Sequence, residues 1–140
     1  MVRQGKGAIV NIASVSGIRW LGVPYISYAA TKAAILQFTR VIALQYARSG
    51  IRANSTLPGM MNTPMVHAAE VIAAYGGSVE EMVRRRDEQC PMGRIGDAWD
   101  VAYAMRITLT EDAASAGCGI YAFSRFVVAS GALPCCTRAQ

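Results

Sequence analysis

Three side chains near the start of the sequence have the types and the spacing needed for proton transfer. Tyr28 and Lys32 are four positions apart, so they share one face of any helix that contains them. A lysine ammonium beside a tyrosine favours the phenolate over the phenol, and a phenol tuned in this way can pass a proton near neutral pH. The hydroxyl of Ser14, which belongs to an earlier segment, would then hold the oxygen that receives the proton.

Two strands and a long helix must position these side chains. Residues 8–12 are short, apolar and branched, which predicts a buried strand. Residues 28–48 are rich in helix formers and place apolar residues along one row, with Ser27 as the expected N-cap. Residues 51–57 predict a second strand, which a Pro-Gly pair ends.

This order of elements predicts where the site lies. In a parallel strand–helix–strand unit, both strands end, and the helix begins, at the same edge of the sheet, and ligands bind there. Ser14 follows the first strand, Tyr28 and Lys32 open the helix, and Pro58 and Gly59 follow the second strand. We therefore expect these five residues to converge on one site.

The segment after the second strand contains several Pro and Gly residues and predicts irregular structure with a few helical turns over residues 60–95. Segments of this length often cover a site, so we interpret it as a substrate lid. Residues 97–109 predict a helix and residues 126–129 a last strand. Four apolar residues either line a substrate pocket or pack the core and lid: Trp20, Val23, Met60 and Met65.

Composition indicates a globular domain with few charges. Of the 140 residues, 53% are hydrophobic and 16% are charged. Either much of the chain is buried, or a partner covers some of its apolar surface. Acidic residues surround the run Arg84–Arg86, which favours a solvated helix face over a nucleic-acid site. We expect no nucleic acid, and no membrane association, because no apolar run reaches transmembrane length.

The residues that commonly bind metals do not form a pattern. The cysteines at 90, 118, 135 and 136 lack the spacing of a zinc site or a redox pair, and the single His67 has no spaced partner. We expect no metal. Reduced thiols favour a cytoplasmic location.

Five segments together resemble the short-chain dehydrogenase/reductase family: Asn-Ile-Ala-Ser at 11–14, Tyr-Ala-Ala-Thr-Lys at 28–32, residues 51–59, Met-Met-Asn-Thr-Pro-Met at 60–65, and residues 93–102. The resemblance implies an α/β fold, a Rossmann-like doubly wound parallel sheet. This chain would carry only its second half, about three strands plus helices. The implied function is that of an oxidoreductase that uses NAD or NADP on a small alcohol or carbonyl substrate.

The resemblance also implies a role for each site residue. Tyr28 would be the proton donor in carbonyl reduction and the base in alcohol oxidation. Lys32 would favour the phenolate and bind the nicotinamide ribose. The resemblance places both Tyr28 and Lys32 in the cofactor site. Ser14 would hold the substrate oxygen. The other cofactor-binding residues that the resemblance implies are Pro58, Gly59 and Thr63.

The sequence departs from the family at both ends. No Gly-x-x-x-Gly-x-Gly turn is present, so we expect residues 1–140 to be an incomplete catalytic domain that lacks the glycine-rich dinucleotide-binding half. After residue 106 the tail diverges, either through a reading-frame change or as a natural variant. The alternative to an oxidoreductase is a truncated, catalytically silent fragment. It would retain only a subunit-association surface along the long helix and form a homo-oligomer.

Overall fold

A parallel sheet forms the centre of the molecule. The computed structural model describes residues 1–90, 92–109 and 118–123 of the 140-residue chain. Its main sheet has three strands in the order β1 (Gly7–Ile12), β2 (Ile51–Pro58) and β5 (Cys118–Phe123). Both neighbouring pairs are parallel, which confirms the α/β class and the two strands predicted first. The strand predicted at 126–129 lies outside the described residues.

The central strand is the most deeply buried element. Most of β2 is buried, and Leu57 is fully enclosed, because strands flank it on both sides and helices cover its faces. By contrast, β1 is half-buried over most of its length and exposed at Ile12. The register of the pair aligns Ile12 with Thr56, so both strands end at one edge of the sheet.

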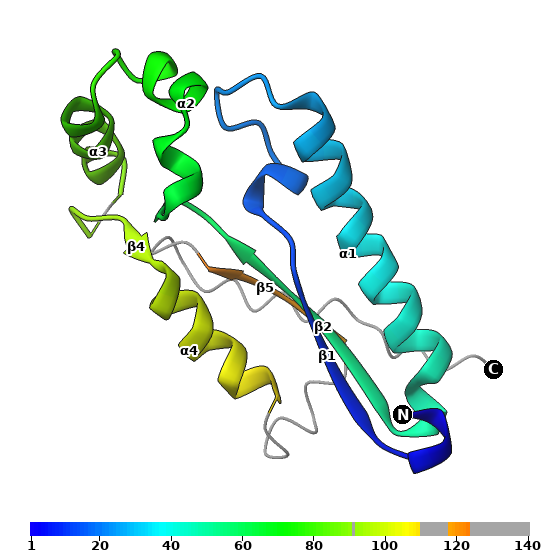
Figure 1. The fold of residues 1–140 in the computed structure, drawn as a ribbon. Helices are drawn as coiled ribbons and strands as arrows, with labels where there is room; N and C mark the ends of the chain where they lie inside the picture. The colour runs from blue at the N-terminus through cyan, green and yellow to red at the C-terminus, as the bar shows by residue number, and fades with distance from the viewer. Residues whose placement is uncertain (91, 110–117, 124–140) are drawn as a thin grey trace.

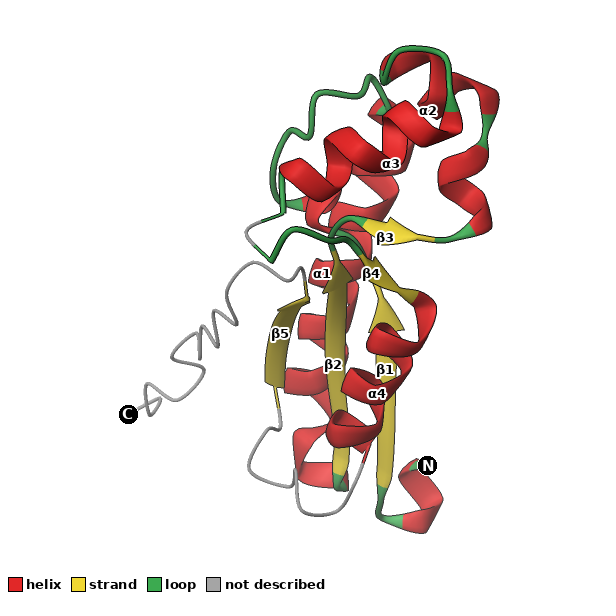
Figure 2. Cartoon of the chain, turned by 90° about the vertical axis from the view of Figure 1, so that its left-hand side faces the viewer, coloured by secondary structure: helices red, strands yellow, loops and turns green. Residues whose placement is uncertain are grey.

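Two helices cover opposite faces of this sheet (Figures 1 and 2). One face packs against α1 (Ile26–Tyr46), which continues into a short 3-10 turn and stops at Gly50, where φ is +69°. The other face packs against α4 (Ala98–Leu109), close to its predicted range. The predicted N-cap was wrong: Ser27 lies inside α1, and Tyr25 occupies the cap without a side-chain hydrogen bond.

The segment beyond the second strand is more helical than its glycines and prolines predicted. It lies past the carboxyl ends of the strands, as Figure 2 shows. A short parallel pair, β3 (Met61–Asn62) with β4 (Gly96–Asp97), joins its two ends. Between them lie the 3-10 turn η4 (Pro64–His67) and the helices α2 (Ala69–Ala74) and α3 (Val79–Glu88).

Two separate hydrophobic clusters stabilise these two parts. Ala13, Val15, Leu36 and Leu57 form the cluster between the sheet and α1. A second cluster, formed by Val66, Val71 and Met82, holds η4, α2 and α3 together. None of the described helices combines the length and apolarity needed to cross a membrane.

Candidate active site

The serine that follows β1 is held rigidly at the end of the strand. The backbone N–H of Ala13 donates to the Thr56 carbonyl at 2.8 Å, which continues the ladder with β2 as far as the site. Ser14 then caps the 3-10 turn η2 (Val15–Gly17), and its Oγ accepts a hydrogen bond from the Ser16 N–H at 3.2 Å. Because that bond uses Oγ as an acceptor, the Ser14 hydroxyl proton is available for a ligand oxygen.

Tyr28 and Lys32 lie one turn apart at the start of α1, as the spacing predicted. The Lys32 ammonium lies 5.6 Å from the centroid of the Tyr28 ring. It also donates a hydrogen bond to the Ile12 carbonyl at 3.0 Å, which ties the helix to the end of β1. The lysine thus keeps a positive charge beside the tyrosine while its position is fixed by the strand.

The turn that carries Ser14 packs very closely against the helix that carries Tyr28 and Lys32. A Cβ added to Gly17 would lie 2.8 Å from the Ala33 nitrogen and 2.8 Å from the Lys32 carbonyl carbon. Both are backbone atoms that a side-chain rotation cannot move. The absence of a side chain at residue 17 therefore sets the separation between Ser14 and the pair on α1.

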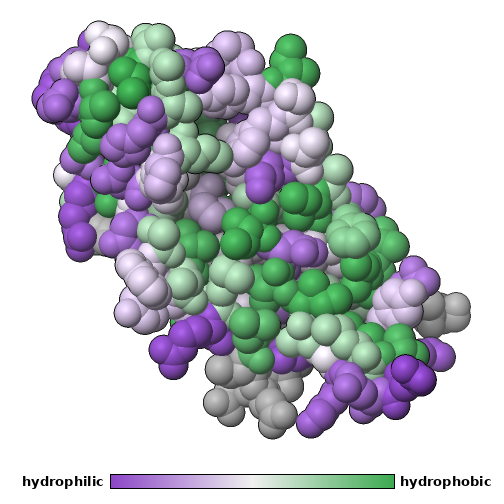
Figure 3. Space-filling model, viewed as in Figure 1, coloured by the Kyte–Doolittle hydropathy of each residue, from purple (hydrophilic) through white to green (hydrophobic). Residues whose placement is uncertain are grey.

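These residues line a single cleft of about 940 Å³ at the carboxyl ends of the strands. Figure 3 shows the surface hollowed between the segment of α2 and α3 and the start of α1. All six residues predicted for the site are in its lining: Ser14, Tyr28, Lys32, Pro58, Gly59 and Thr63. Ser16, the adjacent serine, and the four apolar pocket candidates Trp20, Val23, Met60 and Met65 line it as well.

The wall opposite the sheet edge comes from the segment that contains η4, α2 and α3. Tyr25 and Tyr75 pack against the cluster of Val66, Val71 and Met82, and they line the cleft. The Tyr25 ring also meets the Tyr28 ring edge to face, with 6.1 Å between centroids. Tyr25 therefore connects this wall to Tyr28.

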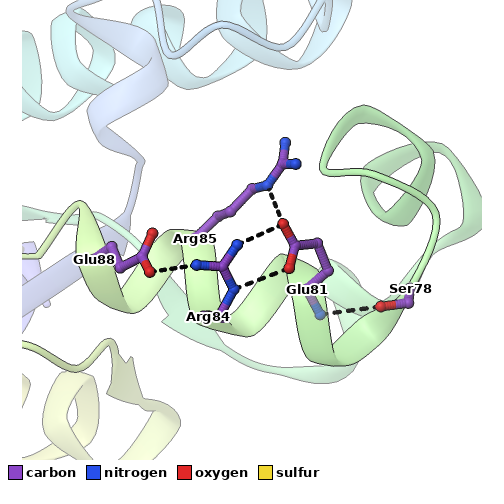
Figure 4. Close-up of polar contacts among 5 residues, drawn as sticks. All are labelled: Ser78, Glu81, Arg84, Arg85 and Glu88. Atoms are coloured by element: carbon purple, nitrogen blue, oxygen red, sulfur yellow. Dashed lines mark hydrogen bonds and ion pairs between the residues drawn. The ribbon is translucent and has the colours of Figure 1, made fainter.

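The arginine run on α3 was interpreted as a solvated face, and this is wrong for one of its members. Arg84 and Arg85 are exposed and pair with Glu81, and Arg84 also pairs with Glu88 (Figure 4). Arg86 is only 6% exposed and lines the cleft. The signal for this was the spacing of Met82 and Arg86, four positions apart, which puts both on the inner face of α3.

The only histidine has a local partner. His67 Nε2 lies 3.0 Å from Asn62 Oδ1 across the lid turn. In the part of the chain that the structure describes, no three His, Cys, Asp or Glu side chains gather as a metal site requires.

Comparison with known proteins identifies the family. The profile of a family described as enoyl-(acyl carrier protein) reductase matches residues 1–121. The chain is 34% identical over 117 residues to 2-keto-3-deoxy-L-fuconate dehydrogenase of Xanthomonas campestris, which covers 82% of this chain and 37% of that enzyme.

Solved structures agree with this match. A Burkholderia xenovorans protein described as a short-chain dehydrogenase/reductase has a TM-score of 0.79 and 43% identity, covering 89% of this chain and 47% of that one. A variant of actinorhodin polyketide ketoreductase solved with NADPH has a TM-score of 0.71 and 36% identity, covering 82% and 44%. The chain spans less than half the length of each of these relatives. On this evidence, the chain belongs to the short-chain dehydrogenase/reductase family.

Proposed function

We propose that the chain carries the proton-transfer half of an NAD- or NADP-dependent oxidoreductase that interconverts a small alcohol and its carbonyl compound. The observation that supports this most is the convergence of Tyr28, Lys32 and Ser14 on one cleft, with the ammonium 5.6 Å from the phenol ring. These groups come from two segments, the turn after β1 and the start of α1, which meet at the carboxyl edge of the sheet.

In the reductive direction, the Tyr28 hydroxyl donates its proton to the substrate carbonyl oxygen, and in the oxidative direction Tyr28 accepts the alcohol proton. The Ser14 hydroxyl donates a hydrogen bond to the same oxygen and fixes its position. The positive charge of Lys32 stabilises the phenolate that remains after the proton has left. The nicotinamide cofactor, when bound, supplies or accepts the hydride.

The residues at the cleft suit the nicotinamide end of such a cofactor. A cleft of about 940 Å³ is within the range of small-molecule sites. Lys32 and the Thr63 hydroxyl offer donors, and the backbone at Pro58–Gly59 offers close approach. The glycine-rich turn that cradles a pyrophosphate is not in this sequence, so we expect weak cofactor binding and little turnover by the 140-residue chain. We further propose that residues 60–95 act as the substrate lid.

Cofactor titration with a matched pair of tyrosine variants tests this function. NADH and NADPH are titrated into the chain by fluorescence, and turnover is followed with a panel of small ketones. Tyr28→Phe should lower turnover by about 10²- to 10⁴-fold, the usual size of an acid–base contribution, and should weaken cofactor binding far less. Tyr103→Phe on α4, which is 60% exposed and outside the cleft, is the control and should leave turnover unchanged. Turnover that survives Tyr28→Phe would refute the assignment.

A second function, subunit association without catalysis, is supported by the exposed apolar side chains of the two covering helices. Phe38, Val41 and Leu44 on α1 are 60%, 46% and 56% exposed. On α4, Trp99, Tyr103 and Ile107 follow one another at four-residue spacing, and each is at least 60% exposed. Apolar residues gather around α1 in Figure 3. Surfaces of this kind mark interfaces, so we propose a homo-oligomer. A folded chain that associates but binds no cofactor would favour this second function.

A further inference from the structure

Arg86 differs from its two neighbours in the arginine run because it points inward. Arg84 and Arg85 have side chains that are 58% and 49% exposed and share the carboxylate of Glu81, whereas Arg86 is 6% exposed. Arg86 lies one helical turn after the fully buried Met82, so the same face of α3 carries both. A guanidinium has thus been placed against the apolar cluster of the lid.

No carboxylate neutralises this buried charge within the described residues. The ion pairs of α3 use Arg84 and Arg85, and the buried Arg86 Nε has no hydrogen-bond partner. The Arg86 guanidinium lies over the face of the Tyr75 ring, with its carbon 5.8 Å from the centroid. A ring face attracts a cation weakly and does not replace the hydrogen bonds that a buried guanidinium loses to water. Burial lowers the pKa of Arg86 accordingly.

The cleft beside Arg86 has an excess of positive charge. Its charged lining residues are three with a positive charge, Arg19, Lys32 and Arg86, and one with a negative charge, Glu70. Glu70 is exposed, and among the described residues it does not form an ion pair with Arg86. The field in the cleft therefore favours a ligand with a negative charge.

Tyr25 brings Arg86 into the neighbourhood of the proposed proton donor. Burial, Glu70 and Tyr75 raise the pKa of Tyr25, and the positive charge of Arg86 opposes that rise, so the two groups lie within electrostatic range. The Tyr25 ring in turn contacts the Tyr28 ring at 6.1 Å. Tyr25 therefore lies between Arg86 and the phenol of Tyr28 in this chain of contacts, and all three residues line the same cleft.

We propose that Arg86 anchors a carboxylate of the substrate, so that the alcohol or carbonyl compound handled at Tyr28 is a hydroxy acid or the matching oxo acid. This inference rests on the proposed function. A carboxylate fits because its two oxygens match the guanidinium fork and its single charge neutralises a single buried cation. A phosphate would bring a second charge into a wall built from Val66, Val71 and Met82.

Binding of matched probes to the full 140-residue chain, without cofactor, tests the anchor separately from the reaction. The probes are 3-hydroxybutanoate, the uncharged 1,3-butanediol with the same carbon number, and inorganic phosphate, each followed by calorimetry. The carboxylate should bind at least tenfold more tightly than the diol, and phosphate more weakly than the carboxylate. Arg86→Met should weaken carboxylate binding by about 10- to 100-fold, as expected for lost hydrogen bonds to a charged group.

Arg85→Met is the matched control, because it removes an exposed arginine of the same helix, and it should leave carboxylate binding unchanged. Tyr28→Phe should still prefer the carboxylate over the diol, because the hydroxyl that contacts Tyr28 is common to both probes, so a failure of catalysis leaves the anchor testable. Equal binding by Arg86→Met and the original chain, or stronger binding of phosphate than of carboxylate, would overturn the proposal.

The stability of the variant separates an anchor from a structural residue. An unpaired buried cation destabilises the fold, so Arg86→Met should unfold at the same or a higher urea concentration. If Arg86→Met does not fold, the binding of the same probes to Arg86→Lys tests the anchor instead. This variant keeps the charge without the fork, and the proposal requires it to favour the carboxylate over the diol by a smaller factor than arginine does. The proposal is contradicted if a folded Arg86→Lys chain loses all preference for the carboxylate over the diol. It is also contradicted if that preference equals the preference of the original chain.

Discussion

The two walls of the cleft are built in different ways. The sheet wall carries Ser14, Tyr28 and Lys32 on elements that pack on the main cluster around Leu57. The lid wall carries Tyr75 and Arg86 on short helices with a cluster of their own. The groups proposed for proton transfer therefore rest on one core, and the group proposed to select the substrate rests on another.

This separation has a physical consequence. Side chains on the ends of buried strands are held by the backbone ladder and by close helix packing, whereas those on the lid depend on three buried apolar residues, Val66, Val71 and Met82. Regions with few buried contacts open at lower free energy than the main core. We therefore expect the proposed lid to open at lower free energy than the sheet wall, which would keep its geometry.

The strongest test of this difference replaces one fully buried residue in each core. Leu57→Ala and Met82→Ala each remove a side chain that is 0% exposed. Each should lower the free energy of unfolding of the part that contains it by about 2–5 kcal/mol. Leu57→Ala should lower the free energy of unfolding of the whole chain. Met82→Ala should lower hydrogen-exchange protection in α2 and α3 and leave that of β2 nearly unchanged. Equal loss of protection in α3 and β2 after Met82→Ala would show one cooperative unit.

A second test moves the two parts of the sheet wall relative to each other. Gly17→Ala puts a methyl group against the backbone of α1, so the turn that carries Ser14 must shift. Overpacking of this kind costs about 1–3 kcal/mol in the free energy of unfolding. Turnover should fall further than stability explains, because Ser14 moves away from Tyr28. Ile18→Ala, at a neighbouring residue that is 59% exposed, is the control. Normal turnover in Gly17→Ala would show that the spacing is not critical.

The sheet wall could be predicted from the sequence because its residues follow from topology. Once two parallel strands and a crossover helix are recognised, the ends of the strands and the start of the helix must meet at one edge, which placed Ser14, Tyr28 and Pro58 correctly in the cleft. Strand and helix ranges followed from apolar runs and from the stop at Gly50. The catalytic roles of these residues stay predictions.

The lid could not be predicted in the same way, because its features depend on the phase of short helices. Acidic neighbours on both sides of Arg84–Arg86 indicated a solvated face. Only the helical position of Arg86, one turn after the buried Met82, shows that this arginine faces inward. Glycines and prolines between residues 60 and 95 also suggested less helix than forms. The N-cap at Ser27 failed because the helix begins at Ile26, two residues before the predicted start, with Tyr25 as its cap.

A third prediction compares the starts of two helices. Ser78 caps α3, and its Oγ accepts a hydrogen bond from the Glu81 N–H at 3.0 Å (Figure 4). Ser78→Ala should therefore cost about 1 kcal/mol of lid stability, measured by hydrogen exchange within α3. Ser27→Ala in α1 removes no capping bond and should change the free energy of unfolding by less than about 0.5 kcal/mol. A larger effect at Ser27 than at Ser78 would contradict these assignments.

The smallest expected effect is the pH dependence of the lid. Hydrogen bonds from Arg84 and then Arg85 lower the pKa of the Glu81 carboxyl from its ordinary value of 4.5 to about 2. Because the folded state holds the carboxylate more strongly than the unfolded state does, this contribution to stability is present above pH 4.5. It is lost as the pH falls from 4.5 towards 2. The pairs lie at the surface, so salt should weaken the effect.

Urea unfolding of the original chain and of Glu81→Gln, at pH 7 and at pH 3, measures this contribution. The difference in midpoint between the two chains should be larger at pH 7, should shrink at pH 3, and should shrink further in 1 M salt. Hydrogen exchange should assign the difference to α3, with no change in β1 and β2, since Glu81 belongs to the lid. A difference that grows as the pH falls would mean that the glutamate is stabilised in its protonated form. That result would contradict the geometry of its two arginine partners.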